Sequence, residues 1–156
     1  MNDDVNPTSK DHLRLWLRVL KTNRLVEAEL RERLRVQFDT TLPRFDVMSA
    51  LYRNGQGMKM SELSRLLMVS NGNVTGIVDR LTDDGLMRRE AVPGDRRAAR
   101  VRLTEKGRAE FERQAAAHEA WVSELLSGLD GAGSVALIDG LRTALTLDTG
   151  ESDDAQ

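Results

Sequence analysis

Apolar residues recur at helical spacing along most of the chain. Steps of three or four residues from Leu13 to Leu34 predict one long amphipathic helix over residues 11–35. The run Thr40-Thr41-Leu42-Pro43 then combines a cap candidate with a proline suited to a first helical turn, which predicts a second helix over residues 43–53. Its apolar spacing places three residues inward: Phe45, Met48 and Leu51.

Two short helices joined by a tight turn are expected next. Ser61 is expected to cap a helix over residues 62–67, and Ser70 to cap another that ends at Asp83-Asp84-Gly85. Met58-Lys59-Met60, just before them, reads as a connector or a minimal strand. The expected inward residues are Leu63, Leu66 and Leu67 in the first helix and Val74, Ile77, Val78 and Leu81 in the second.

Beyond Gly85 the apolar period changes from 3.6 to 2, which predicts paired strands over residues 86–92 and 98–103. The segment between them begins with turn residues and ends in Arg96 and Arg97, so the hairpin has a charged tip. Thr104 is expected to cap a long helix with a heptad-like seam from Phe111 to Leu129, a pattern typical of packing against another helix or subunit. Gly131 and Gly133 are expected to break it before a last helix over residues 134–147.

This order of elements predicts a mainly α (α+β) fold, a winged helix-turn-helix with long N- and C-terminal dimerisation helices. The expected divisions are a flexible N-terminus (1–9), a helical dimerisation region (10–36 and 108–147), a winged DNA-binding domain (37–107) and an acidic flexible tail (148–156).

Composition narrows the function classes. The 156 residues suit one domain, and 40% apolar with 31% charged residues is typical of a soluble globular protein. The chain has no cysteine, which excludes disulfides, thiolate metal sites and cysteine nucleophiles, and its two histidines show no zinc spacing. We therefore expect no metal, no cofactor and no enzyme activity. Without an apolar run of about 20 residues or a basic signal at the start, a cytoplasmic protein is expected.

The net charge of −2 conceals a basic segment. Residues 88–108 hold seven arginines and one lysine against three acids, a net charge of +5. Since salt screens charges beyond about 8 to 10 Å, this local excess decides attraction to phosphates.

The second short helix and the hairpin are the expected DNA contacts. The outward face of this helix carries Gly72 and Gly76, each of which costs about 1 kcal/mol of helix propensity. Without side chains at these positions, the helix can approach bases closely in the major groove. The arginine tip fits the narrow minor groove, with Asp95 expected to pair with Arg97. The residues predicted to contact or position DNA are Ser70, Asn71, Asn73, Thr75, Gly76 and Arg80 in the helix and Asp95, Arg96, Arg97 and Arg100 in the hairpin. Simple helix capping and a solvated charged surface are the alternative interpretations.

Several motifs resemble the MarR (multiple antibiotic resistance regulator) family. They are Ser61-Glu62-Leu63, Val69-Ser70-Asn71-Gly72-Asn73-Val74-Thr75, Val78-Asp79-Arg80-Leu81, Pro93-Gly94-Asp95-Arg96-Arg97 and Leu103-Thr104-Glu105-Lys106-Gly107. The resemblance extends over nearly the whole chain and implies a homodimer on a pseudo-palindromic operator, released by a small ligand. The absence of cysteine departs from the peroxide-sensing branch of that family.

The resemblance also implies an effector crevice between the dimer helices and the winged domain, for an aromatic acid. Residues 40–48 resemble members that control catabolism of phenolic compounds, some of which sense the acyl-CoA thioester. The candidate ligand residues are His12, Trp16, Leu20, Arg44, Phe45 and Met48. Core packing of Trp16 and Met48 and a surface charge at Arg44 are the simpler interpretations of the same residues. A dimeric interaction module without DNA binding and a small cofactor-free enzyme remain competing functions.

Overall fold

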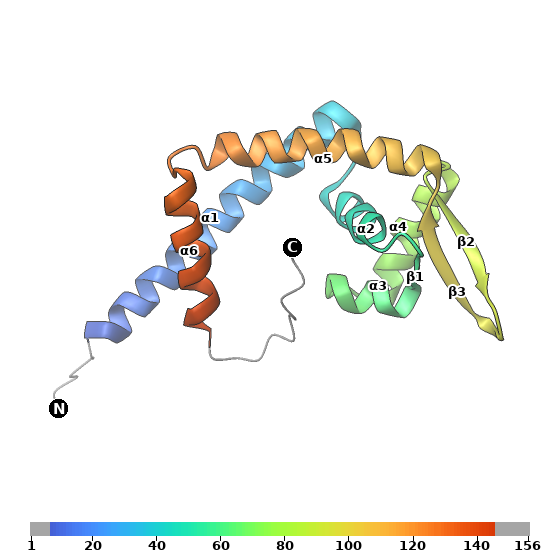
Figure 1. Ribbon diagram of the computed structural model, residues 1–156, viewed down its shortest axis with the longest axis horizontal. Coiled ribbons are helices and arrows are strands. Elements are labelled where there is room, and N and C mark those ends of the chain that lie inside the picture. Colours follow the sequence, from blue (N-terminus) through green and yellow to red (C-terminus); the bar gives the residue numbers. More distant parts are fainter. Residues whose placement is uncertain (1–6, 146–156) are drawn as a thin grey trace. The chain divides into compact units, whose positions relative to one another are not determined.

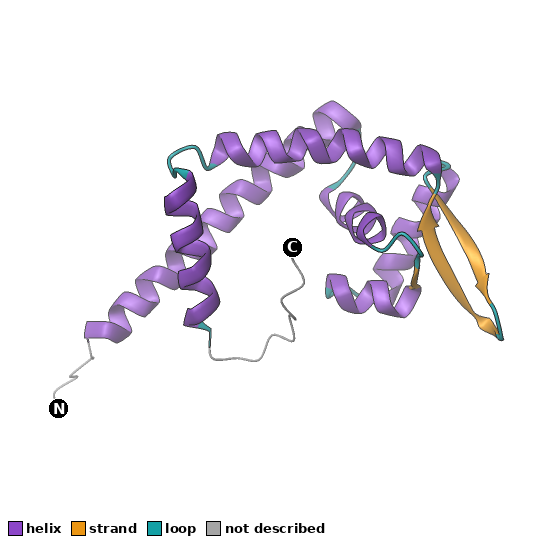
Figure 2. Cartoon of the chain, viewed as in Figure 1, coloured by secondary structure: helices purple, strands orange, loops and turns teal. Residues whose placement is uncertain are grey.

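The structure, a computed structural model, describes residues 7–145 as helices with one small antiparallel sheet (Figures 1 and 2). This confirms the predicted winged-helix fold class. The described residues form two compact units, one up to Val122 and the other from Ser123 onward. Within the described range, no helix is long and apolar enough to span a membrane.

Helix α1 (Pro7–Phe38) is longer than predicted at both ends. Residues 7–9, expected to belong to a flexible terminus, form its first turn, and proline is favourable at that position. Arginine–glutamate pairs three or four residues apart, such as Arg31 with Glu27 at 2.5 Å and Arg35 with Glu32 at 2.7 Å, line its second half. The apolar pattern missed the first turn because its residues after Pro7 are polar, whereas at the other end Val36 is 64% exposed and does not continue the buried face.

Helix α2 (Leu42–Arg53) begins one residue before its predicted start, with the Thr41 hydroxyl accepting from the Arg44 amide at 3.3 Å. Phe45, Met48 and Leu51 are buried, as the spacing indicated, and Val47 joins them in the core.

Strand β1 (Met58–Lys59) leads directly into helix α3 (Met60–Leu67). The predicted cap at Ser61 is wrong, because Lys59 is the N-cap and its amide donates to the Glu62 carboxylate at 2.9 Å. Leu63 is buried as expected, whereas Leu66 is 55% exposed. Ser64 takes the second inward position, since its hydroxyl donates to the Val69 carbonyl at 2.6 Å and closes the turn.

Helix α4 (Asn71–Asp83) follows that turn and matches its prediction closely. Ser70 caps it, with its hydroxyl accepting from the Asn73 amide at 3.3 Å. Val74, Val78 and Leu81 are fully buried, while Ile77 is half-buried. At the far end Gly85 adopts φ +74°, and the next amide, of Leu86, returns to the Leu81 carbonyl at 2.9 Å.

The wing consists of β2 (Met87–Val92) and β3 (Asp95–Leu103), and the sheet order is β1-β3-β2. Its turn is only Pro93-Gly94, with Gly94 at φ +82°, so residues 95–97 start a strand instead of forming a loop. Met87, Val101 and Leu103 bury the inner face of the hairpin.

Helix α5 (Glu105–Leu125) starts at Thr104, whose hydroxyl accepts from the Gly107 amide at 3.0 Å. Helix α5 ends at Leu125, four residues before Leu129, the last residue of the predicted heptad-like seam. Helix α6 (Gly131–Ala144) begins at the glycines expected to lie before it, because Asp130 caps it by accepting from the Gly133 amide at 2.7 Å. Residues 146–147 of the predicted last helix and the tail 148–156 lie outside the described residues.

Candidate nucleic-acid interface

The outward face of α4 is open. A Cβ atom added to Gly72 or Gly76 would meet nothing within 4 Å, and Asn71, Asn73 and Arg80 are exposed beside them. The buried residues of α4 lie on its opposite side. No packing contact therefore explains the two glycines, and the face is free for a ligand that approaches the helix closely.

Two of the predicted contacts on this helix also serve the helix itself. The Ser70 hydroxyl is the cap, and the Thr75 hydroxyl donates to the Asn71 carbonyl at 2.8 Å. Arg80 lies 3.5 Å from the Asp84 carboxylate, with both side chains substantially exposed, so this pair holds the guanidinium only weakly.

Arg89, which the sequence analysis did not select, connects the wing to α4. Its guanidinium on β2 pairs with the Asp79 carboxylate on α4. The pair spans ten residues of sequence between two different elements, so helix periodicity contains no signal for it. Both side chains are substantially exposed, so the pair connects the wing strand to α4 but contributes little stability.

At the wing tip, Arg96 and Arg97 are exposed. The expected ion pair between Asp95 and Arg97 is not what the structure shows. The Asp95 carboxylate instead accepts from the Arg97 backbone amide at 3.0 Å, a local bond that short acidic side chains make readily in turns. The Asp95 carboxylate thus does not bind the Arg97 guanidinium, which remains available to contact DNA.

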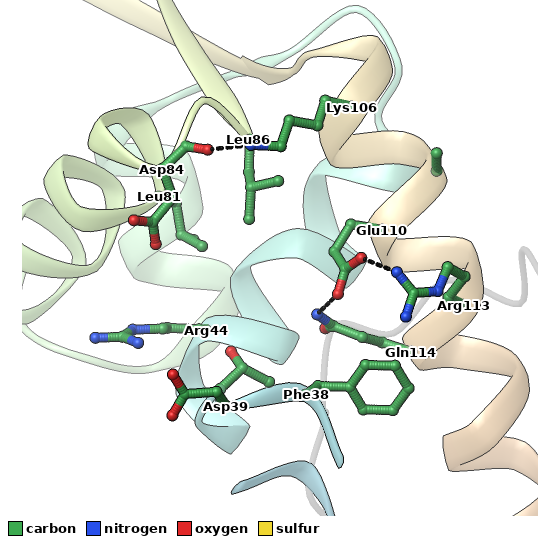
Figure 3. Close-up of a pocket in the computed structure, with 12 residues that line it drawn as sticks. Phe38, Asp39, Arg44, Leu81, Asp84, Leu86, Lys106, Glu110, Arg113 and Gln114 are labelled. Atoms are coloured by element: carbon green, nitrogen blue, oxygen red, sulfur yellow. Dashed lines mark hydrogen bonds and ion pairs between the residues drawn. The ribbon is translucent and has the colours of Figure 1, made fainter. Parts of the chain in front are cut away.

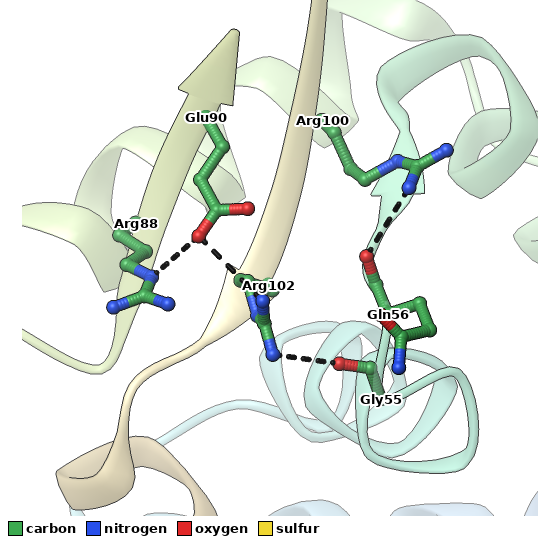
Figure 4. A network of polar contacts seen from close by, with 6 residues as sticks. All are labelled: Gly55, Gln56, Arg88, Glu90, Arg100 and Arg102. Atoms are coloured by element: carbon green, nitrogen blue, oxygen red, sulfur yellow. Dashed lines mark hydrogen bonds and ion pairs between the residues drawn. The ribbon is translucent and has the colours of Figure 1, made fainter. Parts of the chain in front are cut away.

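Arg100 and Arg102 reach across to the segment between α2 and β1 (Figure 4). Arg100 Nη1 donates to the Gln56 carbonyl at 3.5 Å, and Arg102 Nη2 donates to the Gly55 carbonyl at 3.1 Å. Glu90 lies between Arg88 and Arg102, at 2.9 and 3.7 Å. In this structure Arg100 therefore supports the base of the wing, while its predicted DNA contact stays a prediction.

The six predicted ligand residues do not line one pocket within the protomer. His12 and Trp16 are exposed on α1, whereas Met48 is fully buried in the core. Phe45 is also buried, and its ring stacks on the His118 imidazole with centroids 4.6 Å apart. Of the six, Arg44 alone lines the pocket in Figure 3.

That pocket has a volume of about 480 Å³ and lies among the end of α1, the start of α2, the end of α4 and the first half of α5. Phe38, Leu81 and Leu86 supply apolar walls. The charged residues that line the pocket are of both signs, Arg44, Lys106 and Arg113 with Asp39, Asp84 and Glu110. Gln114 is only 2% exposed, and its amide nitrogen donates to Glu110 at 3.1 Å. Its buried carbonyl oxygen has no hydrogen-bond partner among the described residues. An unpaired buried acceptor costs about 1 to 3 kcal/mol.

Comparison with known proteins places this geometry in a family. The model of the MarR family matches residues 40–99, from the start of α2 to the middle of β3. The uncharacterized HTH-type transcriptional regulator YkoM of Bacillus subtilis is 33% identical over 128 residues, which are 82% of this chain and 80% of YkoM. The chain belongs to the MarR family.

Solved structures of MarR-family proteins have the same fold. A MarR family transcriptional regulator from Silicibacter pomeroyi is 32% identical with a TM-score of 0.73, covering 89% of this chain and 96% of its own. A mutant of E. coli MarR, solved in complex with operator DNA, is 26% identical with a TM-score of 0.74, covering 86% and 96%. This chain is accordingly a MarR-family transcriptional regulator and not an enzyme.

The family match includes every predicted DNA residue except Arg100. Other relatives match over shorter stretches: the HTH-type transcriptional regulator PecS of Dickeya dadantii is 33% identical over 85 residues, 53% of this chain and 51% of PecS. The resemblance to the branch for aromatic catabolism stays a prediction.

His118 gives this MarR-family protein a specific pH dependence. Burial against Phe45 lowers the pKa of His118, opposed by the nearby Asp46 carboxylate. The unfolded chain, with an ordinary histidine pKa of about 6.5, then takes up the proton first as pH falls. We expect the free energy of unfolding to fall between pH 7.5 and pH 5.5, and His118→Gln to remove part of that fall.

Urea unfolding at the two pH values measures this difference. His12→Gln, at an exposed position on α1, is the control and should keep the wild-type difference. An identical pH dependence in His118→Gln and wild type would contradict the assignment. Burial also raises the pKa of Asp46, which acts oppositely, because stability from that carboxyl grows as pH falls toward its ordinary value of 3.8.

Proposed function

We propose that this protein is a homodimeric DNA-binding repressor that a small aromatic ligand releases from a pseudo-palindromic operator. The observation that carries the DNA-binding part is the open face of α4, with two glycines that touch nothing, next to a wing tip with unneutralised arginines. A helix with such a face fits the major groove, and an arginine-tipped hairpin fits the minor groove.

The proposed DNA contacts keep the roles that the sequence indicated. Ser70, Asn71 and Asn73 lie at the start of α4, where free amides favour a phosphate. The remaining contacts are Thr75, Gly76 and Arg80 on α4, and Arg96, Arg97 and Arg100 on the wing, positioned by Asp95. The relationship to a protein solved with operator DNA supports this assignment.

Binding to a duplex at increasing salt tests the proposal. We expect the logarithm of the affinity to fall steeply and linearly with the logarithm of salt concentration, since each phosphate contact releases counterions. Arg80→Ala and Arg97→Ala should each weaken binding about tenfold, or 1.4 kcal/mol. Salt-insensitive binding, or unchanged affinity in both variants, would favour the interaction module.

Exposed apolar residues support the dimer. On α1, Leu13, Trp16 and Leu17 are each more than half exposed. On α6, Val135, Ile138 and Leu141 are exposed as well. Apolar surface left in water costs about 25 cal/mol per Å², so both helices gain by packing against a second copy.

Sedimentation equilibrium should give twice the protomer mass for the wild type. Leu17→Glu should shift the protein toward the monomer, because it replaces an apolar side chain of the proposed interface with a charged one that loses hydration on burial. Lys21→Gln, one turn further along α1, is the matched control and should stay dimeric. A wild-type monomer at micromolar concentration would contradict the dimer.

The pocket in Figure 3 supports an effector site, because its walls come both from α4 and from α1 and α5. We expect a small aromatic acid to contact its apolar walls and Arg44, and its CoA thioester is the alternative ligand. The other predicted contacts lie outside this pocket and stay predictions: His12, Trp16, Leu20, Phe45 and Met48. Thermal-shift screening of phenolic acids and their CoA esters tests this, since a ligand at 100 times its Kd adds about 2.7 kcal/mol. Absence of any shift, or equal shifts in Arg44→Gln, would count against this pocket.

A further inference from the structure

A second hollow lies between α4 and the wing, on the side of the proposed DNA contacts. It has a volume of about 390 Å³. Its walls come from β1, the start of α3, the start of α4 and the beginning of β3. The residues that matter for its chemistry are Lys59, Ser61, Asn71, Thr75 and Arg97.

The hollow is positively charged. Lys59 and Arg97 both line it, and no carboxylate does. Two carboxylates that lie close to these cations in sequence bind main-chain amides: Glu62 accepts from the Lys59 amide at 2.9 Å, and Asp95 accepts from the Arg97 amide at 3.0 Å. Among the described residues, neither the Lys59 ammonium nor the Arg97 guanidinium forms an ion pair, so both are available to an anion. The polar groups of Asn71 and Ser61 line the same hollow.

The place of Lys59 is fixed by two elements. In β1 it pairs with Arg100 of β3 in the antiparallel register, and its backbone also caps α3. Arg100 directs its own guanidinium to the Gln56 carbonyl. Lys59 is thus the cation that this edge of the sheet contributes to the hollow.

The geometry of DNA determines what passes over this hollow. The major and minor grooves are separated by a single sugar-phosphate backbone. If α4 occupies one groove and the tip of the wing the next, that backbone must cross between them, over Lys59 and Arg97. We propose, resting on the DNA-binding function above, that this hollow binds a backbone phosphate of the operator and that Lys59 is its principal cation.

The test uses a duplex enriched from a random pool by the wild-type protein, with its Kd measured from 50 to 300 mM KCl. Each lost phosphate contact lowers the salt slope by about 0.9, so Lys59→Gln should lower it by about 2 per dimer and weaken binding about 60-fold at 0.1 M salt. Because a phosphate contact is blind to sequence, the ratio of affinities for the enriched duplex and a random duplex should not change.

Two further variants complete the test. Lys59→Arg keeps the positive charge and should retain the wild-type slope, and Lys21→Gln, on the exposed face of α1, should have no effect. Thermal melting confirms that each variant is folded. The role of Lys59 is overturned by any one of three results. They are a wild-type salt slope in Lys59→Gln, an equal loss of affinity in Lys59→Arg, or a changed ratio of affinities for the enriched and the random duplex. If the wild type binds no duplex from the pool, the proposed function fails and this inference fails with it.

Discussion

Replacing Gly107 by alanine is expected to destabilise the protein by about 3 kcal/mol, the upper end of the usual cost of overpacking. A Cβ atom at this position would lie 2.0 Å from the Leu86 carbonyl oxygen and 2.9 Å from its carbon. Both are backbone atoms, so no rotamer change relieves the contact. Either α5 or the segment after α4 has to move.

Neither can move without losing hydrogen bonds. The Thr104 hydroxyl donates to the Gly85 carbonyl at 2.7 Å, the Thr104 amide donates to the Leu86 carbonyl at 3.1 Å, and Lys106 Nζ donates to the Asp84 carbonyl at 2.9 Å. The first turn of α5 is therefore bound to the end of α4 through main-chain groups. An added methyl group separates elements that these bonds hold together.

Urea unfolding of Gly107→Ala measures the effect. Gly128→Ala is the control, because a Cβ there meets nothing within 4 Å and its φ is not in the left-handed region. We expect the control to stay within about 0.5 kcal/mol of the wild type, as substitutions at open surface positions usually do. A Gly107→Ala variant as stable as the control would mean that α5 and Leu86 do not approach each other this closely in solution.

The sequence predicted well the elements whose signals are local. Ser70 and Thr104 cap α4 and α5 as expected, because a hydroxyl three residues before a free amide needs no distant partner. The inward positions of α4 followed from its spacing alone, and they determine which side of α4 is open.

Features that depend on distant residues were missed. Arg100 contacts Gln56, 44 positions earlier, and Arg89 contacts Asp79 on another element, so neither pairing appears in any periodic pattern. The cap of α3 was misplaced because Glu62 bonds to the Lys59 backbone, which makes an unlikely residue type the N-cap. The sequence analysis did not select Lys59, because only the folded chain brings β1 beside α4 and the wing.

The predicted ligand residues show a different limit. Apolar spacing identified Phe45 and Met48 as inward, which is correct, but it does not distinguish a core position from a pocket wall. The pocket in Figure 3 instead includes Gln114 and Lys106, polar residues on α5 that no apolar pattern selects.

Gly76→Ala is expected to change stability and DNA binding in opposite directions. Alanine is about 1 kcal/mol more favourable than glycine inside a helix, and nothing within 4 Å obstructs its Cβ, so the free energy of unfolding should rise by about that amount. On the proposed groove-facing surface the same methyl group occupies space needed for close approach to bases. A steric cost of about 1.4 kcal/mol per protomer weakens binding about a hundredfold in a dimer.

Paired measurements of urea unfolding and duplex affinity on the same Gly76→Ala preparation separate the two effects. A misfolded variant would lose both stability and DNA affinity. A higher free energy of unfolding together with a weaker affinity for the duplex therefore cannot come from misfolding. Gly128→Ala, open to solvent but outside α4, should bind DNA like the wild type. If Gly76→Ala gains stability and keeps its affinity for the duplex, the glycine face of α4 does not meet DNA and the assignment of the recognition surface is wrong.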